Sequence, residues 1–150
     1  MKSAPWAALV AAVLLVGCRD SPAEVVGKAS EAAAGGDLVA VQGYFSNTAL
    51  HRLERRWDQE QRSRAEGWQE LSEKLTFDRK ALEVKGEELA GDFARVLATA
   101  GAEERDFYLR KEDGRWRLEP GAAPRFGRAR ASAAATAPPS APAEGGSTGR

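Results

Sequence analysis

Hydrophobic residues recur every three or four positions in the stretch that begins at Ser21, and this spacing predicts helices. The first predicted helix has one stripe of small and branched apolar side chains, namely Val26, Ala29 and Ala33. Ser21 is a typical N-cap, Pro22 suits the first helical position, and Glu24 completes a capping box. We therefore expect a helix from Pro22 to about Ala34, ended by two glycines.

Further helical segments are expected between residues 37 and 74. Asp37 caps a short one, whose apolar positions are Leu38, Val41 and Phe45. The same spacing then returns in two groups of apolar residues, which are Leu50, Leu53 and Trp57, and Trp68, Leu71 and Leu75. Between these groups only Ala65 is apolar, and Gly67 lowers helix propensity by about 1 kcal/mol relative to alanine. A bend or break is predicted there.

After Leu75 the apolar period shortens to two residues, which is typical of strands. We expect four strands, over residues 77–85, 89–100, 103–111 and 115–119, with boundaries at Gly86, Gly101 and Gly114. Phe107 and Leu109 alternate with polar residues, and Trp116 and Leu118 do the same. Asp113-Gly114 between these two strands predicts a hairpin, because glycine accepts the positive φ of tight hairpin turns.

Helices followed by an antiparallel sheet predict an α+β fold. Residues 21–120 suffice for one domain with a modest core. Residues 121–150 are rich in alanine, glycine, proline and serine, with Phe126 as their only aromatic residue, so we expect a disordered tail.

The chain begins with a short apolar run, Trp6 to Val16, that follows Lys2. It is too short to span a bilayer, which needs about 20 apolar residues, and it is typical of a cleaved secretory leader. Gly17 and Cys18, the only cysteine, come directly after it. The sequence Leu-Val-Gly-Cys at 15–18 resembles the lipobox of bacterial lipoproteins.

In that family the leader, here residues 1–17, is cut between Gly17 and Cys18, and acyl chains such as palmitate are attached to the cysteine. The resemblance implies a protein anchored to the membrane by lipid, with residues 18–20 as anchor and spacer. Arg19, rather than aspartate, after the cysteine favours the outer membrane, facing the periplasm. The alternative is an ordinary signal peptide with Cys18 near its cleavage site by chance.

Charge is distributed unevenly along the chain. Residues 18–120 carry 17 Lys plus Arg against 21 Asp plus Glu, a balance of −4, whereas residues 121–150 have a balance of +3. Nucleic-acid binding needs a concentrated basic face, so no nucleic-acid partner is predicted. The charge run from Arg52 to Arg64 mixes both signs and is expected to be a solvated helix face.

Four short segments resemble the nuclear transport factor 2-like superfamily, which has a cystatin-like fold. They are Ser-Pro-Ala-Glu-Val-Val at 21–26, Gly-Gly-Asp at 35–37, Gly-Asp-Phe-Ala at 91–94 and Lys-Glu-Asp-Gly-Arg-Trp-Arg-Leu at 111–118. The resemblance covers roughly residues 21–119. It implies N-terminal helices packed on a curved four-stranded antiparallel sheet, which forms a cone open to a pocket at one end. Members include ketosteroid-isomerase-like enzymes, binding modules and dimerisation modules, so the fold does not name the chemistry.

An isomerase of this kind needs a carboxylate base inside the cone and a neutral acid or phenol opposite. The only such assortment is Tyr44, Asp92, Asp106 and Tyr108, and no catalytic motif of the family falls on these positions. We therefore predict no catalytic residues and no cofactor. His51 is the only histidine, and without clustered histidines or cysteines no metal site is expected.

Aromatic side chains are the main candidates for ligand contact, and they are equally candidates for the core. Arg95, between Phe93 and Leu97 on one strand face, is the charged residue expected to meet the concave side of the sheet. There it would recognise an anion, or extend its stem along the core and place its guanidinium in solvent. The candidate ligand-binding residues are Tyr44, Trp57, Trp68, Phe93, Arg95 and Trp116.

These observations predict a non-enzymatic lipoprotein domain of the cell envelope that binds a small or peptidic ligand or a protein partner. A rival hypothesis makes the sheet a structural surface for a homodimer or an envelope assembly. An isomerase-like or dehydratase-like enzyme is the third hypothesis.

Replacing the cysteine tests the predicted anchor. The variant Cys18→Ser should be released from membranes or remain uncleaved, because it lacks the thiol that carries the acyl chain. Incorporation of labelled fatty acid is the measurement. Equal labelling of the variant and the natural chain would contradict the anchor.

Overall fold

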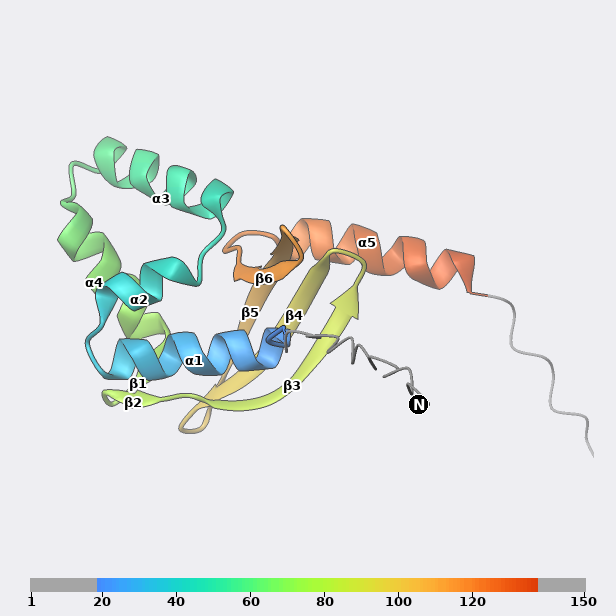
Figure 1. Cartoon of the computed structure of the whole chain (residues 1–150), viewed down its shortest axis with the longest axis horizontal. Coiled ribbons are helices and arrows are strands. Elements are labelled where there is room, and N and C mark those ends of the chain that lie inside the picture. The colour runs from blue at the N-terminus through green and yellow to red at the C-terminus, as the bar shows by residue number, and fades with distance from the viewer. Residues whose placement is uncertain (1–18, 138–150) are drawn as a thin grey trace, which may run out of the picture.

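The computed structural model describes residues 19–137. The predicted leader, Gly17 and Cys18 lie outside the described residues, as does the last part of the predicted tail. The fold is α+β, with helices and a four-stranded antiparallel sheet (Figure 1). This confirms the predicted α+β class and, up to residue 118, the order of helices before strands.

Five helices are described: α1 (Pro22–Ala34), α2 (Leu38–Gly43), α3 (Asn47–Gln59), α4 (Arg64–Lys74) and α5 (Ala123–Thr136). The main sheet has the order β3-β4-β5-β6, and its strands are β3 (Glu83–Ala90), β4 (Phe93–Ala100), β5 (Glu103–Glu112) and β6 (Arg115–Leu118). A small separate hairpin joins β1 (Thr76–Phe77) to β2 (Lys80–Ala81). In Figure 1, α2, α3 and α4 gather on the left, and α5 extends to the right.

Helix starts follow local sequence signals. The capping box at Ser21 is formed as predicted, with Ser21 Oγ accepting from Glu24 N and the Glu24 carboxylate accepting from Ser21 N. Asp37 caps α2 through Ala40 N. Ser63 and Glu66 make a second capping box at the start of α4. The predicted break in the long helical stretch is confirmed, and it lies at residues 60–63.

Gly67 lies inside α4 and has a packing role there. The Trp57 indole of α3 occupies the place where a side chain at Gly67 would stand, so a Cβ would overlap the ring. Trp57 in turn meets Trp68 edge to face, with ring centroids 5.4 Å apart. The missing side chain of Gly67 therefore allows α3 and α4 to approach closely.

The core lies between the helices and one face of the sheet. Leu109 is opposite Ala94 on one side and Leu118 on the other, so these three side chains share that face. They belong to one buried cluster with Val26 of α1. The predicted alternation puts four residues on the core face: Phe107, Leu109, Trp116 and Leu118. The structure confirms this, because Leu109 and Leu118 belong to the buried cluster and Phe107 and Trp116 pack against it.

Two predicted strands, over residues 77–85 and 89–100, have the wrong bounds, and the first is interrupted by the turn between β1 and β2. Gly86 lies inside β3, where the register with β4 shifts between Val84 and Gly86. The chain reverses instead at Gly91, whose φ of +59° supplies the left-handed conformation of the turn. The predicted strand over residues 89–100 is therefore split between β3 and β4, because a flexible glycine inside a strand can mark either a turn or a bulge.

The expectation that residues 121–150 are disordered is wrong for the first part of that segment. α5 spans Ala123–Thr136, and Phe126 is buried against Tyr108 with ring centroids 5.8 Å apart. Arg130 also pairs with Glu88 of β3 at 2.9 Å. Alanine is the best helix former, so this alanine-rich segment favours a helix. The Phe126 contact and the Arg130 ion pair attach that helix to the sheet face opposite the core.

Substitution of two helical glycines tests the packing of α3 on α4. Gly67→Ala should lower the free energy of unfolding by about 1–3 kcal/mol, because the new methyl group overpacks the Trp57 contact. Gly27→Ala is the matched control, since nothing lies within 4 Å of its Cβ position, and it should raise stability by about 0.5–1 kcal/mol. Urea unfolding measures both. Equal effects of the two substitutions would contradict the packing.

Candidate functional site

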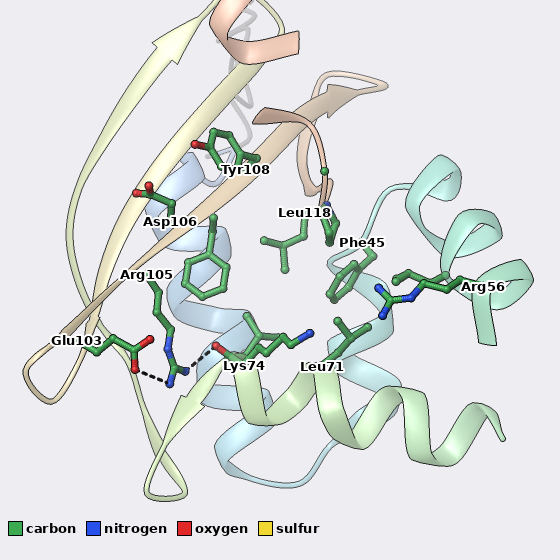
Figure 2. Close-up of a pocket in the computed structure, with 14 residues that line it drawn as sticks. Phe45, Arg56, Leu71, Lys74, Glu103, Arg105, Asp106, Tyr108 and Leu118 are labelled. Carbon is green, nitrogen blue, oxygen red and sulfur yellow. Dashed lines mark hydrogen bonds and ion pairs between the residues drawn. The ribbon is translucent and has the colours of Figure 1, made fainter. Parts of the chain in front are cut away.

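A cleft of about 500 Å³ opens between strand β5 and the helices α3 and α4. It is lined by residues of all three elements and by the segment that leaves β6 (Figure 2). The strand contributes the stretch from Glu103 to Tyr108, apart from Glu104. The last residue of β6, Leu118, and the segment after it, with Pro120 and Gly121, complete this side. This cleft is the candidate site.

Apolar side chains form the floor of the cleft. Phe45 and Leu118 are almost fully buried, whereas Leu71 and Phe107 are half-buried. Figure 2 shows Phe45, Leu71 and Leu118 pointing toward one another around the open space. An apolar group that enters the cleft would remove the exposed parts of Leu71 and Phe107 from water, which stabilises a complex by roughly 25 cal/mol per Å² of apolar surface.

Two cationic side chains stand at the helix side of the cleft. Arg56 of α3 pairs with Glu60 at 2.7 Å, and Lys74 of α4 pairs with Glu70 at 2.9 Å. Hydrogen bonds from Lys74 and Arg62 hold the pKa of Glu70 at about 2. The Arg56 and Lys74 side chains are more than half exposed, and exposed pairs of this kind contribute only about 0–1 kcal/mol, so a ligand anion can compete for both cations.

Arg105 ties the end of α4 to β5 at the lower wall of the cleft. Its guanidinium donates to the carbonyl oxygens of Lys74 and Thr76, both at 2.9 Å. It also lies 3.7 Å from the Glu103 carboxylate, and Figure 2 shows it between Glu103 and Lys74. A cation at a helix C-terminus satisfies its free carbonyl groups and complements the helix dipole. Arg105 therefore has a structural role and is not free for a ligand.

A buried carboxylate fixes the other end of the helical wall. Glu119, directly after β6, is fully buried and accepts a hydrogen bond from Ser46 Oγ. Ser46 is also the N-cap of α3, where its Oγ accepts from Ala49 N at 3.0 Å. Arg52 of α3 lies 3.3 Å from Glu119 and donates to the carbonyl of Pro120. We call these contacts the Glu119 junction; it joins the start of α3 to the end of the sheet.

Three aromatic candidates from the sequence lie away from the cleft. Trp57 and Trp68 are buried in the core, and Trp68 meets Phe45 edge to face with centroids 5.3 Å apart. Tyr44 is half-buried, and its carbonyl accepts from Leu118 N at 2.7 Å. None of the three tryptophan and tyrosine side chains lines the cleft. The sequence left open whether these aromatic residues contact a ligand or form the core. Trp57 and Trp68 belong to the core.

The remaining candidates are dispersed. Trp116 is half-buried beneath Lys111, whose Nζ lies 5.6 Å from the ring centroid. Phe93 and Arg95 lie on the face of β4 that points away from the core, whereas Ala94 between them lies on the core face. The structure does not bring the six predicted ligand-binding residues together into one site.

The expectation that Arg95 meets the concave side of the sheet is wrong. Ala94 and Val96 occupy the core face of β4, so Arg95 between them faces the other way. Its guanidinium makes a two-pronged pair with Asp106, at 2.9 and 3.0 Å, and this pairing raises its pKa. Small residues at the core positions of β4 hide this alternation in the sequence, because Phe93 and Leu97 are the larger apolar side chains.

The residues weighed for catalysis do not converge on the cleft floor. The Asp106 side chain is held by Arg95, and Tyr108 packs on Phe126 on the same face. Asp92 is exposed in a turn, and His51 is exposed on α3. Within residues 19–137, no group of three or more His, Cys, Asp and Glu side chains is placed to hold a metal ion, and no helix is long and apolar enough to cross a membrane.

Comparison with known proteins finds no family model, no curated protein and no solved structure that matches this chain. The predicted ligand-binding residues do not include the lining residues of the cleft, among them Lys74, Arg105 and Leu71. The helical spacing marks Leu71 as apolar, but it does not show that this residue is left half-covered beside a strand.

Removal of the buried carboxylate tests the Glu119 junction. Glu119→Ala should lower the free energy of unfolding by roughly 3 kcal/mol, because Ser46 and Arg52 lose their shared partner. Glu60→Ala, which removes the exposed partner of Arg56, is the control and should cost less than about 1 kcal/mol. Chemical denaturation measures both. Equal losses would mean that the junction does not hold the helices in place.

Proposed function

We propose that this protein is a bacterial envelope lipoprotein, anchored through Cys18 in the outer membrane and facing the periplasm. Its domain binds a small or peptidic ligand in the cleft between β5 and the helices α3 and α4, without catalysing a reaction. The observation that carries the proposal is the open cleft with a half-exposed apolar floor and two cations at its side. Concave sites of this size that combine an apolar floor with polar groups at their sides are typical of ligand binding.

The contacts of the cleft define the chemistry of the ligand. Leu71 and Phe107 favour an apolar body, and Lys74 and Arg56 favour an acidic group at its end. Of the carboxylates that line the cleft, Asp106 is held by Arg95 on the opposite face, and Glu103 is largely exposed and lies 3.7 Å from Arg105. Neither is placed as a free base over the apolar floor, which supports binding rather than acid–base chemistry.

The start of the domain lies close to the proposed lipid. Arg19 donates to the carbonyl of Gly114 at 3.4 Å, and Asp20 pairs with Lys28 at 2.6 Å. The two residues that follow Cys18 therefore lie against the folded part and leave little free spacer. We infer that ligand binding takes place near the membrane surface.

We also propose that the fold is the nuclear transport factor 2-like cone. Helices that precede the sheet, the strand order β3-β4-β5-β6 and a cleft between the sheet and the helices support it. The fold alone does not specify a ligand or a reaction, because the superfamily combines one fold with many functions.

A bulky side chain in the cleft tests the proposed site. The whole mature chain, residues 18–150 with Cys18→Ser, should bind the apolar anion 1-anilinonaphthalene-8-sulfonate, detected by its fluorescence. Leu71→Trp should weaken this binding at least about tenfold by filling the cleft, which corresponds to roughly 1.4 kcal/mol. Leu50→Trp, at a half-buried leucine of α3 outside the cleft, is the control and should have little effect.

Melting temperatures show whether each variant is folded. Absence of binding to the natural chain, or an equal loss in both folded variants, would contradict the site. Concentration-dependent dimerisation in analytical ultracentrifugation, without dye binding, would favour the rival hypothesis of a structural module.

A further inference from the structure

Strand β5 is unpaired along part of the edge that faces the cleft. The β5 ladder with β6 runs from Leu109 to Glu112, so it covers only the second half of β5. Glu119 N then donates to Tyr108 O at 2.8 Å, after which the chain turns away through Pro120. Residues 103–107 of β5 therefore extend beyond the last partner on this side.

The direction of each β5 peptide group follows from two hydrogen bonds. Tyr108 O accepts from Glu119 N on the β6 side, whereas Lys111 N donates to Asp92 O on the β4 side at 2.8 Å. Because backbone groups alternate between the two neighbours along an antiparallel strand, Arg105 and Phe107 bond to β4. The N–H and C=O groups of Glu104 and Asp106 face the cleft side.

The lining of the cleft agrees with this alternation. Asp106 and Tyr108 belong to the lining although their side chains lie on the opposite face, where Arg95 and Phe126 hold them. Figure 2 shows both side chains directed away from the apolar group around Leu118. They border the cleft through their main chain. One wall of the cleft is thus a strand edge with free hydrogen-bonding groups, and the floor beside it is apolar.

We propose that the cleft binds an extended peptide, which adds to the sheet as a strand beside residues 104–106 of β5. This inference rests on the proposed function and names its ligand class. Main-chain hydrogen bonds to Asp106 provide affinity, and alternate side chains of the peptide enter the apolar floor formed by Leu71 and Phe107, as in other complexes that extend a sheet. An acidic side chain or a free C-terminal carboxylate meets Lys74.

Three of the four charged side chains in residues 103–107 are paired within the chain, and the fourth, Glu104, lies on the face opposite the apolar floor. Charged residues on an edge strand often prevent pairing with another chain. Here Asp106 is paired with Arg95 on the far face, and Arg105 is used by the end of α4 and by Glu103. The cations Arg56 and Lys74, which hold only exposed surface partners, favour an acidic peptide over a basic one.

The main chain of Asp106 can be altered without touching the β4 ladder. Asp106→Pro removes the N–H group that faces the cleft, and proline is tolerated on an edge strand where that group is not used in the sheet. Asp106→Ala is the matched control, because it removes the same ion pair with Arg95 and keeps the N–H group. Melting temperatures of the two variants show whether both are folded.

The probe is a set of fluorescein-labelled five-residue peptides that alternate threonine with valine or leucine and end in a free carboxylate. Fluorescence anisotropy with the mature chain carrying Cys18→Ser measures binding. Asp106→Pro should weaken the best binder roughly tenfold, the effect of one lost hydrogen bond, and Asp106→Ala should change it little. N-methylation along the peptide should weaken binding at every second residue, and this second measurement does not depend on a protein variant.

Three other outcomes overturn the inference. If a peptide binds but neither Asp106→Pro nor N-methylation weakens it, binding does not use the strand edge. If no peptide binds while 1-anilinonaphthalene-8-sulfonate does, the cleft takes small molecules, and the proposed function stands without this ligand class. If neither probe binds, the proposed function fails as well.

Discussion

The arrangement of the molecule depends on the buried carboxylate of Glu119. A charged group without exposure to water is stable only when it is paired and hydrogen-bonded, and Ser46 and Arg52 meet that requirement. The partners are the N-cap of α3 and a residue of its N-terminal half, so the requirement determines where this helix sits relative to the end of β6. Ser46 also caps α3, and one hydroxyl therefore links helix initiation to tertiary placement.

The cleft is a consequence of this placement. The Glu119 junction holds α3 at one end of the helical wall, and Arg105 holds the end of α4 at the other. Between these attachments the wall stands away from β5, whose first half extends past the short strand β6. An apolar floor and an open strand edge thus border the same space, and this combination is the basis of the proposed function.

Features set by neighbouring residues were predictable from the sequence. The capping box at Ser21, the Asp37 cap and the Asp113-Gly114 hairpin all depend on contacts within a few positions. Three predictions failed: a strand boundary at Gly86, disorder in the segment that forms α5, and an inward direction for Arg95. Each of these features depends on partners far along the chain. The Glu119 junction joins residues 73 positions apart, so no local pattern marks it.

The central claim, that the first half of β5 keeps a free edge beside the cleft, is tested most directly by amide hydrogen exchange measured by NMR. In the ligand-free chain, the amides of Glu104 and Asp106 should exchange far faster than those of Arg105 and Phe107, which bond to β4. Alternating protection along these four residues is the predicted result. Slow exchange at all four would show that the edge is already covered and would contradict the account.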